Sequence, residues 1–345
     1  MPTFPWSDVL NRVMAGDELS EIEARSAMGE IMGGRADPAQ IGAFIVALRM
    51  KGETVEEMTG LVRGVLDAAV TVDVGEQVVD TAGTGGDRSG TFNISTTAAL
   101  IAAGAGAKVA KHGNRAASSR SGSADLLEEL GVVIDLPADA TVRLVREAGF
   151  GFFFAPHYHP AFRFAVPVRR ALGVPTVFNF VGPLANPARA TRQALGVSDA
   201  AMAAKMIGVL DRLGSEVAFV YFGEDGLDEI TTTAPTFIYR LVDGEVTHAE
   251  FTPEDFGVAR ASMDDLLGGT VEENAAITRS ILEGEPGPKR DIALVNASAA
   301  IVAAGLAGGF VEGVEVAAEA VDSGAAARVL EHVVDLGNEL RTDGG

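Results

Sequence analysis

The chain has 345 residues, a net charge of −21 at pH 7 and no cysteine. This length allows two domains, or one large domain with a small partner. The acidity argues against a general nucleic-acid surface and against an anionic membrane, since both require a basic face. Without cysteine, disulfides, thiolate catalysis and cysteine-ligated metals are excluded.

The N-terminal segment MPTFPWSDVLNRV lacks a basic region followed by an apolar core, so it does not resemble a secretory signal. No stretch of the sequence combines membrane-spanning length with strong hydrophobicity. We therefore predict a soluble cytoplasmic protein, whose acidity mainly serves solubility.

The first seventy residues predict four short helices. Each begins with an N-cap, a capping box or a first-turn proline. In chain order these signals are Ser7 or Asp8, Ser20 with Glu23, Asp37-Pro38, and Thr54 with Glu57. Gly16 is expected to end the first helix, and Gly33-Gly34 the second.

Four helices this short bury little apolar surface on their own. Their apolar faces are expected to pack on another part of the chain or on a second copy of it. Met28, Ile31 and Met32 would serve such a face. The sequence does not decide between the two arrangements.

From residue 77 the pattern changes to alternating strands, loops and helices. Strands are expected at residues 77–82 and 107–110, each followed by a polar loop, at residues 83–87 and 111–115. Helices are expected to begin near Asn93 and at 123–130. This alternation is typical of a parallel α/β sheet, in which ligands bind at the carboxyl edge.

The remaining elements are predicted in the same way. They are a helix at 141–148, a strand at 150–155, a helical stretch at 160–172 interrupted at Pro167, a turn-rich connection at 182–187, a helix at 199–213, a strand at 216–222, an acidic loop at 223–229, a hairpin of strands 237–242 and 245–251 around Asp243-Gly244, and Ala-rich helices from 271 onward.

One window of the chain has an unusual charge distribution. Between Arg88 and Ala124 there is no Asp or Glu, although the chain has 48 of them. The basic residues of the window are Arg88, Lys108, Lys111, Arg115 and Arg120. Glycine and small hydroxyl residues fill many of the other positions, which suits an anion. The alternative is two glycine-rich turns that flank a buried helix.

Two loops in and beside this window contain the candidate ligand-binding groups. The sequence GTGGD follows the first strand and places N–H groups where a diphosphate could lie, although no GxxxxGK[ST] is present. Asn93, Ser95 and Thr96 follow at a helix N-terminus, which favours negative charge but also fits simple helix capping. The loop at 111–115 follows the second strand, and serines come after it. We interpret the pair of loops as a phosphate-rich ligand site.

Other polar residues allow two interpretations each. His112 could be a general base, but a structural or ligand-contacting role is favoured. His157 and His159 could form a metal pair, but packing is favoured because no third ligand is near in the sequence. Asp228-Glu229 could hold Mg²⁺ together with substrate phosphates, or form a solvated acidic turn.

These motifs together resemble the anthranilate phosphoribosyltransferase family of tryptophan biosynthesis. The match runs through GTGGD, NIST, KHGNRAASS, SGSADLLEELG, VRRALG, FNFVGPLANP and DGLDE in order, and it covers essentially the whole chain. It implies a small helical domain at 1–72, completed by helices near 160–187, and an α/β domain at 73–345 with a mostly parallel central sheet. It also implies a homodimer, Mg²⁺, and transfer of phosphoribosyl from phosphoribosyl pyrophosphate (PRPP) to anthranilate.

The resemblance assigns roles residue by residue. Sugar-diphosphate contacts match Gly83, Gly86, Asp87, Thr91, Asn93, Ile94, Ser95 and Thr96. A second phosphate loop matches Lys111, His112, Gly113, Asn114, Arg115, Ala116, Ala117, Ser118 and Ser119, with Ser123. The Mg²⁺ positions match Ser95, Asp228 and Glu229. Anthranilate contacts match Gly83, Asn114 and Arg169, and the catalytic candidates are Lys111, Asn114 and Arg169.

The chain departs from the family pattern at Pro175, where many relatives carry Arg, and Arg88-Ser89-Gly90 belongs to a variable loop. The expected mechanism depends on positioning and on stabilisation of the leaving pyrophosphate, without an essential base. Two other functions remain open: a nucleoside phosphorylase on the same kind of scaffold, and a non-catalytic nucleic-acid-binding relative.

Overall fold

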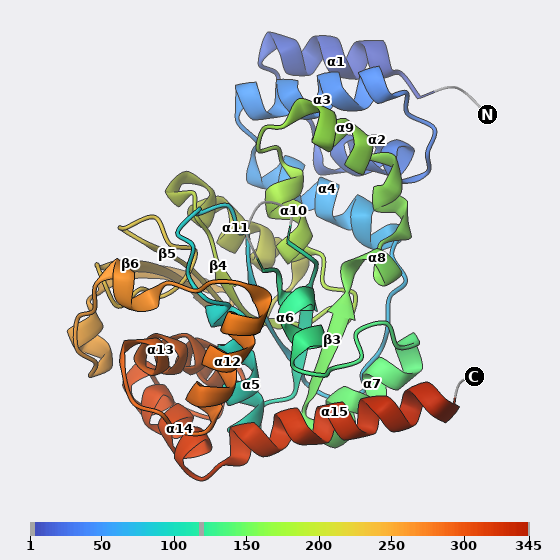
Figure 1. Cartoon of the computed structure of the whole chain (residues 1–345). Helices are drawn as coiled ribbons and strands as arrows, with labels where there is room; N and C mark the ends of the chain where they lie inside the picture. Colours follow the sequence, from blue (N-terminus) through green and yellow to red (C-terminus); the bar gives the residue numbers. More distant parts are fainter. Residues whose placement is uncertain (1–3, 117–120, 344–345) are drawn as a thin grey trace.

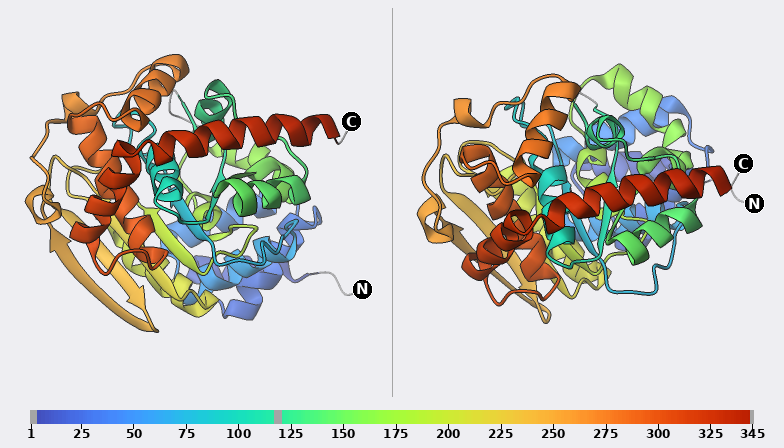
Figure 2. Two further views of the ribbon diagram at one scale, coloured as in Figure 1. Left: turned by 90° about the horizontal axis from the view of Figure 1, so that it is seen from below. Right: turned by 60° about the horizontal axis from the view of Figure 1, so that its bottom comes forward.

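The computed structural model describes residues 4–116 and 121–343. Helices α1–α4, with α9 and α10 against them, form the upper part of the molecule in Figure 1. An α/β part with a seven-stranded sheet lies below, and the long C-terminal helix runs across its far side (Figures 1 and 2). None of the helices in the described ranges is both long and apolar enough to cross a membrane.

The four predicted N-terminal helices are α1 (Trp6–Ala15), α2 (Glu21–Met32), α3 (Pro38–Lys51) and α4 (Val55–Asp67). The predicted caps of α2, α3 and α4 are confirmed, as are the ends of α1 and α2. The predicted cap of α1 is wrong. Pro5 is the N-cap, and its φ of −80° lets the helix begin at Trp6, so Ser7 and Asp8 lie inside the first turn.

Helices α2 and α4 pack closely because two glycines of α4 face α2. A Cβ atom on Gly60 would lie 2.3 Å from the Glu21 carbonyl oxygen, and one on Gly64 would lie 2.7 Å from Met28 Cβ. Met28, Ile31 and Met32 are buried in the chain's own apolar core. For these three residues the structure therefore shows packing within one chain.

The sheet contains β1 (Val79–Gly83), β2 (Val109–Gly113), β3 (Phe150–Phe154), β4 (Arg192–Gly196), β5 (Val217–Gly223), β6 (Thr236–Val242) and β7 (Glu245–Phe251), in the order β3-β2-β1-β4-β5-β6-β7. Strands β1 to β5 are parallel to one another, and the hairpin of β6 and β7 is added antiparallel to β5. The predicted α/β class with a mostly parallel sheet is confirmed, and so is the hairpin.

Two strand predictions need correction. Strand β4 was not predicted, and it occupies the centre of the sheet between β1 and β5. Lys111, His112 and Gly113 were predicted in a loop but form the second half of β2. They continue the strand because they pair in register with residues 152–154 of β3.

The other helices are α5 (Ile94–Gly104), α6 (Ser123–Glu129), α7 (Ala138–Ala148), α8 (Ala155–Tyr158), α9 (Val166–Leu172), α10 (Phe178–Leu184), α11 (Ala200–Leu213), α12 (Val271–Leu282), α13 (Pro288–Ala303), α14 (Phe310–Asp322) and α15 (Ala325–Asp343), with short 3₁₀ helices at Pro160–Phe164, Pro253–Phe256 and Met263–Leu266. The predicted turn at 182–187 is partly wrong, since Gly182 to Leu184 end α10. Pro167 lies in the first turn of α9, where proline is tolerated, and the break in the helical stretch comes before it.

The two faces of the sheet belong to different apolar cores. Phe219 and Tyr221 of β5 point into the core shared with α5 and α12–α15, while Ala218 and Val220 point into the core of α1–α4, α10 and α11. One core thus continues from the helical part onto the sheet. The domain boundary between residues 72 and 73 stays a prediction.

A buried ion pair holds the helical part together and can be tested directly. Glu57 is fully buried, and its carboxylate accepts hydrogen bonds from the backbone of Leu19 (3.0 Å) and Thr54 (2.9 Å) and from Lys51 Nζ (2.8 Å). We expect Glu57→Ala to lower the free energy of unfolding by about 3 kcal/mol, because it leaves a buried ammonium without its partner.

The measurement is urea unfolding followed by the fluorescence of Trp6, the only tryptophan, which is buried in the same core. The matched control is Glu56→Ala, an exposed neighbour on α4, which should change stability by about 0.5 kcal/mol or less. Equal effects of the two substitutions would contradict this account.

Candidate active site

Strands β1, β2, β4 and β5 all end in glycine at the same edge of the sheet. The loop after β5 crosses this edge at close range. A Cβ atom on Gly83 would lie 2.5 Å from Asp228 Oδ2, and one on Gly196 would lie 1.6 Å from the Asp228 carbonyl oxygen. The backbone N–H of Gly85 donates to Asp228 Oδ2 at 2.7 Å. The glycines therefore allow a carboxylate to lie across the strand ends.

Asp228 and Glu229 are both only 8% exposed. Burial raises the pKa of Asp228 to about 6, with a further contribution from the nearby Asp87 carboxylate. Burial, followed by the charge of Asp228, raises the pKa of Glu229 well above its usual range. Two adjacent buried carboxylates that resist ionisation favour a bound cation.

The donor set fits a magnesium ion that shares its ligands with a substrate. Glu229 Oε2 is buried and has no hydrogen-bond partner among the described residues, and the backbone N–H of Ser95 faces the same carboxylate. Within residues 4–116 and 121–343, no group of three or more His, Asp or Glu could hold a metal by itself. Mg²⁺ commonly binds one or two carboxylates and completes its shell with phosphate oxygens and water.

Lys111 lies beneath this edge, inside β2. Its Nζ donates to the Thr81 carbonyl oxygen at 2.6 Å, and its side chain is almost fully buried. Burial lowers the pKa of Lys111, while the carboxylates of Asp80 and Glu229 oppose the shift. Lys111 thus supplies positive charge next to the buried acids.

Asp80 is a residue that the motif analysis missed. It is fully buried in β1, and its Oδ1 accepts from the backbone N–H of His112 at 3.1 Å. Burial raises the pKa of Asp80 to about 6, against the lowering effects of Asn186 and Lys111. Asn186 Nδ2 donates to the Ala110 carbonyl oxygen at 2.8 Å. Asp80 and Asn186 therefore fix the backbone on both sides of Lys111. The sequence signal for Asp80 was an acid inside an apolar strand.

His112 and His159 are buried and neutral at pH 7. The rings of His112 and His159 lie 5.0 Å apart. Burial lowers the pKa of His112 to about 3 and that of His159 to about 4. His157 is exposed and packs against Phe154, so it is not brought together with His159 as a pair of ligands.

Aromatic contacts connect β2 with Arg169 on α9. The ring of His159 packs against Phe162, and Phe162 against Phe178. The Arg169 guanidinium lies over the Phe178 ring at 5.4 Å. Burial lowers the pKa of Arg169, and no acidic partner for it occurs among the described residues. A half-buried guanidinium without an acid suits the carboxylate of a ligand.

The loop after β1 carries several of the predicted contacts. Gly85 and Gly86 have φ values of 64° and 86°, which suit glycine. Ser89 Oγ donates to Asp87 Oδ2 at 2.7 Å and lies 3.2 Å from Thr91 Oγ1. Ile94 and Thr96 are buried in the first turn of α5, so they can reach a ligand mainly through their backbone N–H groups.

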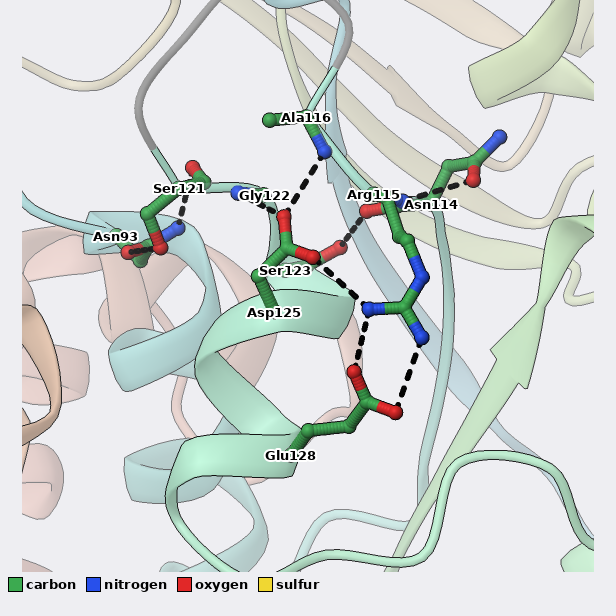
Figure 3. Close-up of polar contacts among 9 residues, drawn as sticks. All are labelled: Asn93, Asn114, Arg115, Ala116, Ser121, Gly122, Ser123, Asp125 and Glu128. Atoms are coloured by element: carbon green, nitrogen blue, oxygen red, sulfur yellow. Dashed lines mark hydrogen bonds and ion pairs between the residues drawn. The ribbon is translucent and has the colours of Figure 1, made fainter. Parts of the chain in front are cut away.

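The Asn93 side chain does not cap α5, which contradicts the simple capping interpretation. Instead, Asn93 Nδ2 donates to the Ser121 carbonyl oxygen at 3.1 Å, and Ser121 Oγ donates to Asn93 Oδ1 at 3.0 Å (Figure 3). The loops after β1 and β2 are therefore joined, as the two-loop interpretation requires.

The loop after β2 is described up to Ala116 and again from Ser121. Asn114 is exposed, and its backbone carbonyl accepts from Ser123 Oγ at 3.2 Å. The Arg115 guanidinium points to α6, where it pairs with Asp125 and Glu128 (Figure 3). Ala117, Ser118, Ser119 and Arg120 lie outside the described residues.

Comparison with known proteins agrees with this arrangement. Residues 7–69 match the helical bundle domain of a glycosyl transferase family, and residues 75–327 match its α/β domain. The anthranilate phosphoribosyltransferase of Moorella thermoacetica is 51% identical over 326 residues, which cover 94% of this chain and 96% of that protein. The enzyme of the same name from Symbiobacterium thermophilum is 48% identical over 336 residues, 97% of this chain and 98% of that protein.

Solved structures give the same result. The crystal structure of anthranilate phosphoribosyltransferase from Thermus thermophilus has a TM-score of 0.91 and 42% identity, and the match covers 96% of this chain and 99% of that one. The Saccharomyces cerevisiae enzyme in complex with PRPP and Mg has a TM-score of 0.88 and 27% identity, with 97% and 98% coverage. The chain belongs to the anthranilate phosphoribosyltransferase family of tryptophan biosynthesis.

Proposed function

We propose that this chain transfers the phosphoribosyl group of PRPP to the amine of anthranilate and releases pyrophosphate, with Mg²⁺ bound at Asp228 and Glu229. The observation that carries the proposal is the buried carboxylate pair at the glycine ends of β1 and β4, beside the N-terminus of α5. A cation site next to a helix N-terminus suits a magnesium-bound diphosphate. The yeast relative that binds PRPP and Mg supports this interpretation.

The metal ligands in this proposal are Asp228 and Glu229, with Ser95 beside them. When bound, Mg²⁺ would supply positive charge to the departing pyrophosphate. The carboxylates accept a cation readily because they lie close together in a site of low polarity. Lys111 remains fixed beneath them by its bond to Thr81, so it adds charge without moving.

The sugar diphosphate would be held by the two loops. Gly83, Gly86, Asp87 and Thr91 lie on or beside the loop after β1, and the N–H groups of Ile94, Ser95 and Thr96 begin α5. From the end of β2, the loop after it and the start of α6 we propose His112, Gly113, Asn114, Arg115, Ala116, Ala117, Ser118, Ser119 and Ser123. Arg115 would contribute its backbone, because its guanidinium is paired with Asp125 and Glu128.

Anthranilate would lie toward α9, with its carboxylate at Arg169 and further contacts from Asn114 and Gly83. The lack of an acidic partner for Arg169 within the described chain supports this placement. The yeast relative has also been solved with 4-fluoroanthranilate.

The catalytic contribution of the chain is positioning and charge stabilisation. Negative charge accumulates on the pyrophosphate as its bond to the ribose C1 breaks, and N–H groups and Lys111 stabilise that charge. The amine of anthranilate then attacks C1 from the opposite face, with inversion. The pKa values of His112 and His159, about 3 and 4, make both poor proton acceptors, so the proton released by the amine passes to water.

We further propose a homodimer formed through the helical part, in the cytoplasm. Met14, Ile22 and Met50 are exposed on α1, α2 and α3 at 65%, 77% and 84%. Exposed apolar side chains on neighbouring helices favour an interface with a second copy. Sedimentation equilibrium would decide the point, since the mass of a single chain would contradict it.

The assay for the function is the loss of anthranilate fluorescence on mixing protein, PRPP and Mg²⁺. We expect the loss to require all three components and to stop when EDTA is added, because the carboxylate pair needs the metal to bind the diphosphate. If fluorescence persists while calorimetry shows PRPP binding, anthranilate is the wrong acceptor. Turnover of a nucleoside with inorganic phosphate would instead indicate a phosphorylase.

The metal site can be separated from acid–base chemistry in the same assay. We expect the double substitution Asp228→Asn with Glu229→Gln to lower kcat by at least about 100-fold, because it removes the charges that hold the cation but keeps their shape. His112→Ala should cost less than about 10-fold, because a buried imidazole with a pKa of about 3 is a poor proton acceptor. Equal losses, or a larger loss from His112→Ala, would overturn the electrostatic mechanism.

The proposed anthranilate contact has a matched control in the neighbouring residue. Arg169→Ala should raise KM for anthranilate about 10- to 100-fold, the effect of losing one charged hydrogen bond. Arg170→Ala, on the exposed side of the same helix, should leave this KM within about 2-fold. Steady-state kinetics at saturating PRPP give both values, and similar changes in the two variants would exclude Arg169 as the carboxylate contact.

A further inference from the structure

Asp125, in the first turn of α6, contacts both described ends of the segment between β2 and α6. Its Oδ2 accepts hydrogen bonds from the backbone N–H of Ala116 at 3.1 Å and of Gly122 at 2.9 Å. Figure 3 shows the carboxylate lying between these two N–H groups. One side chain thus fixes two separate points of the backbone, one on each side of the segment.

The second oxygen of Asp125 is also used. Arg115 Nη1 donates to Asp125 Oδ1 at 3.0 Å, and Arg115 Nη2 donates to Glu128 Oε1 at 3.0 Å. Burial alone would raise the pKa of Asp125, but the N–H groups of Ala116 and Gly122 and the charge of Arg115 hold it below its usual range. The carboxylate is therefore fully ionised at neutral pH and accepts all three bonds.

Gly122 provides an independent sign that the two chain ends must approach closely. A Cβ atom at this position would lie 2.3 Å from the Ala116 nitrogen and 2.6 Å from the Arg115 carbonyl carbon. The φ of Gly122 is −90°, which any residue can adopt. Glycine is therefore needed here for space, and any side chain would separate the ends that Asp125 joins.

Helix capping alone does not explain this arrangement. An acid at the third position of a helix commonly accepts from the N-cap N–H, and the bond from Gly122 is of that kind. The bond from Ala116 and the close contact at Gly122 add nothing to the helix. They connect the end of β2 to the start of α6.

The position of Gly122 also affects the loop after β1. The preceding residue, Ser121, bonds to Asn93 through both its carbonyl oxygen and its hydroxyl. Asn93 in turn accepts from Asn274 Nδ2 at 3.0 Å. Asn114 has its own bonds to α6, from Ser123 Oγ and the Ala124 N–H, which do not involve Asp125.

We propose that Asp125 is a positioning residue for PRPP: by holding Ala116 and Gly122 on one carboxylate, it sets the distance between the loops after β1 and β2. The inference rests on the proposed function, because it assumes that PRPP lies between these loops. Asp125 itself does not touch the substrate in this account. It acts through Ser121 and Asn93 on one side and through the Ala116 N–H on the other.

The test compares Asp125→Ala, Asp125→Asn, Gly122→Ala and the control Glu128→Gln with wild type. We expect Asp125→Ala and Gly122→Ala to raise KM for PRPP about 10-fold or more, while KM for anthranilate at saturating PRPP stays within about 3-fold because Asn114 keeps its own bonds. Asp125→Asn should recover part of the effect, since its amide oxygen can take the place of Oδ2 and accept from both N–H groups, while its amide nitrogen cannot pair with Arg115. Glu128→Gln should leave both KM values within about 2-fold.

A second readout is hydrogen exchange at the Ala116 and Gly122 amides in the free protein, which should become about 10-fold faster in Asp125→Ala. A lower kcat with unchanged KM for PRPP in Asp125→Ala would show that Asp125 only caps α6, and it would overturn the proposal. An equal rise of KM in Glu128→Gln would assign the effect to Arg115 and likewise overturn it. If the wild-type protein neither binds nor turns over PRPP, the proposed function fails together with this inference. If the wild-type kinetics are normal and Asp125→Ala and Gly122→Ala do not change KM for PRPP, only the positioning role is rejected.

Discussion

The site depends on the close approach of a carboxylate to the ends of the central strands. Asp228 occupies the space that a Cβ atom at position 83 or 196 would need, so only glycine fits at the ends of β1 and β4. At that depth, ionised Asp228 and Glu229 are unfavourable unless a cation is present. The fold therefore favours the binding of a cation at the carboxyl edge of the sheet, where parallel sheets bind their ligands.

One positive charge close to the two acids comes from the chain itself. Lys111 is buried beside the two acids, and its strand is fixed by Asp80 at His112 and by Asn186 at Ala110. A flexible lysine at the surface would be free to follow either the acids or a phosphate. A lysine fixed in the middle of a strand stays at a constant distance from the acids and from a bound phosphate. In the proposed mechanism it can therefore stabilise a leaving diphosphate without reorganisation.

Sequence patterns correctly predicted the features that depend on interactions between residues close together in the chain. The capping boxes at Ser20 and Thr54 and the turn at Asp243-Gly244 involve residues within a few positions of each other, and all three are present. Strand β4 could not be found this way, because RQALG becomes a strand only between β1 and β5. Lys111 was predicted in a loop for the same reason, since its pairing partner Phe152 is distant in sequence. Asp80 was missed because its role appears only once β1 and β2 are side by side.

The acid-free window shows how composition can indicate a site without giving its contacts. Lys108 donates to the Arg146 carbonyl oxygen at 2.6 Å, Lys111 is buried, and Arg115 is paired with two acids of α6. Three of the five cations that suggested an anion site are thus engaged with the protein. We therefore propose that recognition of phosphate rests largely on backbone N–H groups at the glycine turns and the α5 N-terminus, whose geometry depends on how the two loops are held. Carboxylates do reach these N–H groups, since Asp228 accepts from Gly85 and the Ser95 N–H faces Glu229, but both acids come from the loop after β5 and not from the window. The composition of the window therefore indicates the site without showing which charges surround it.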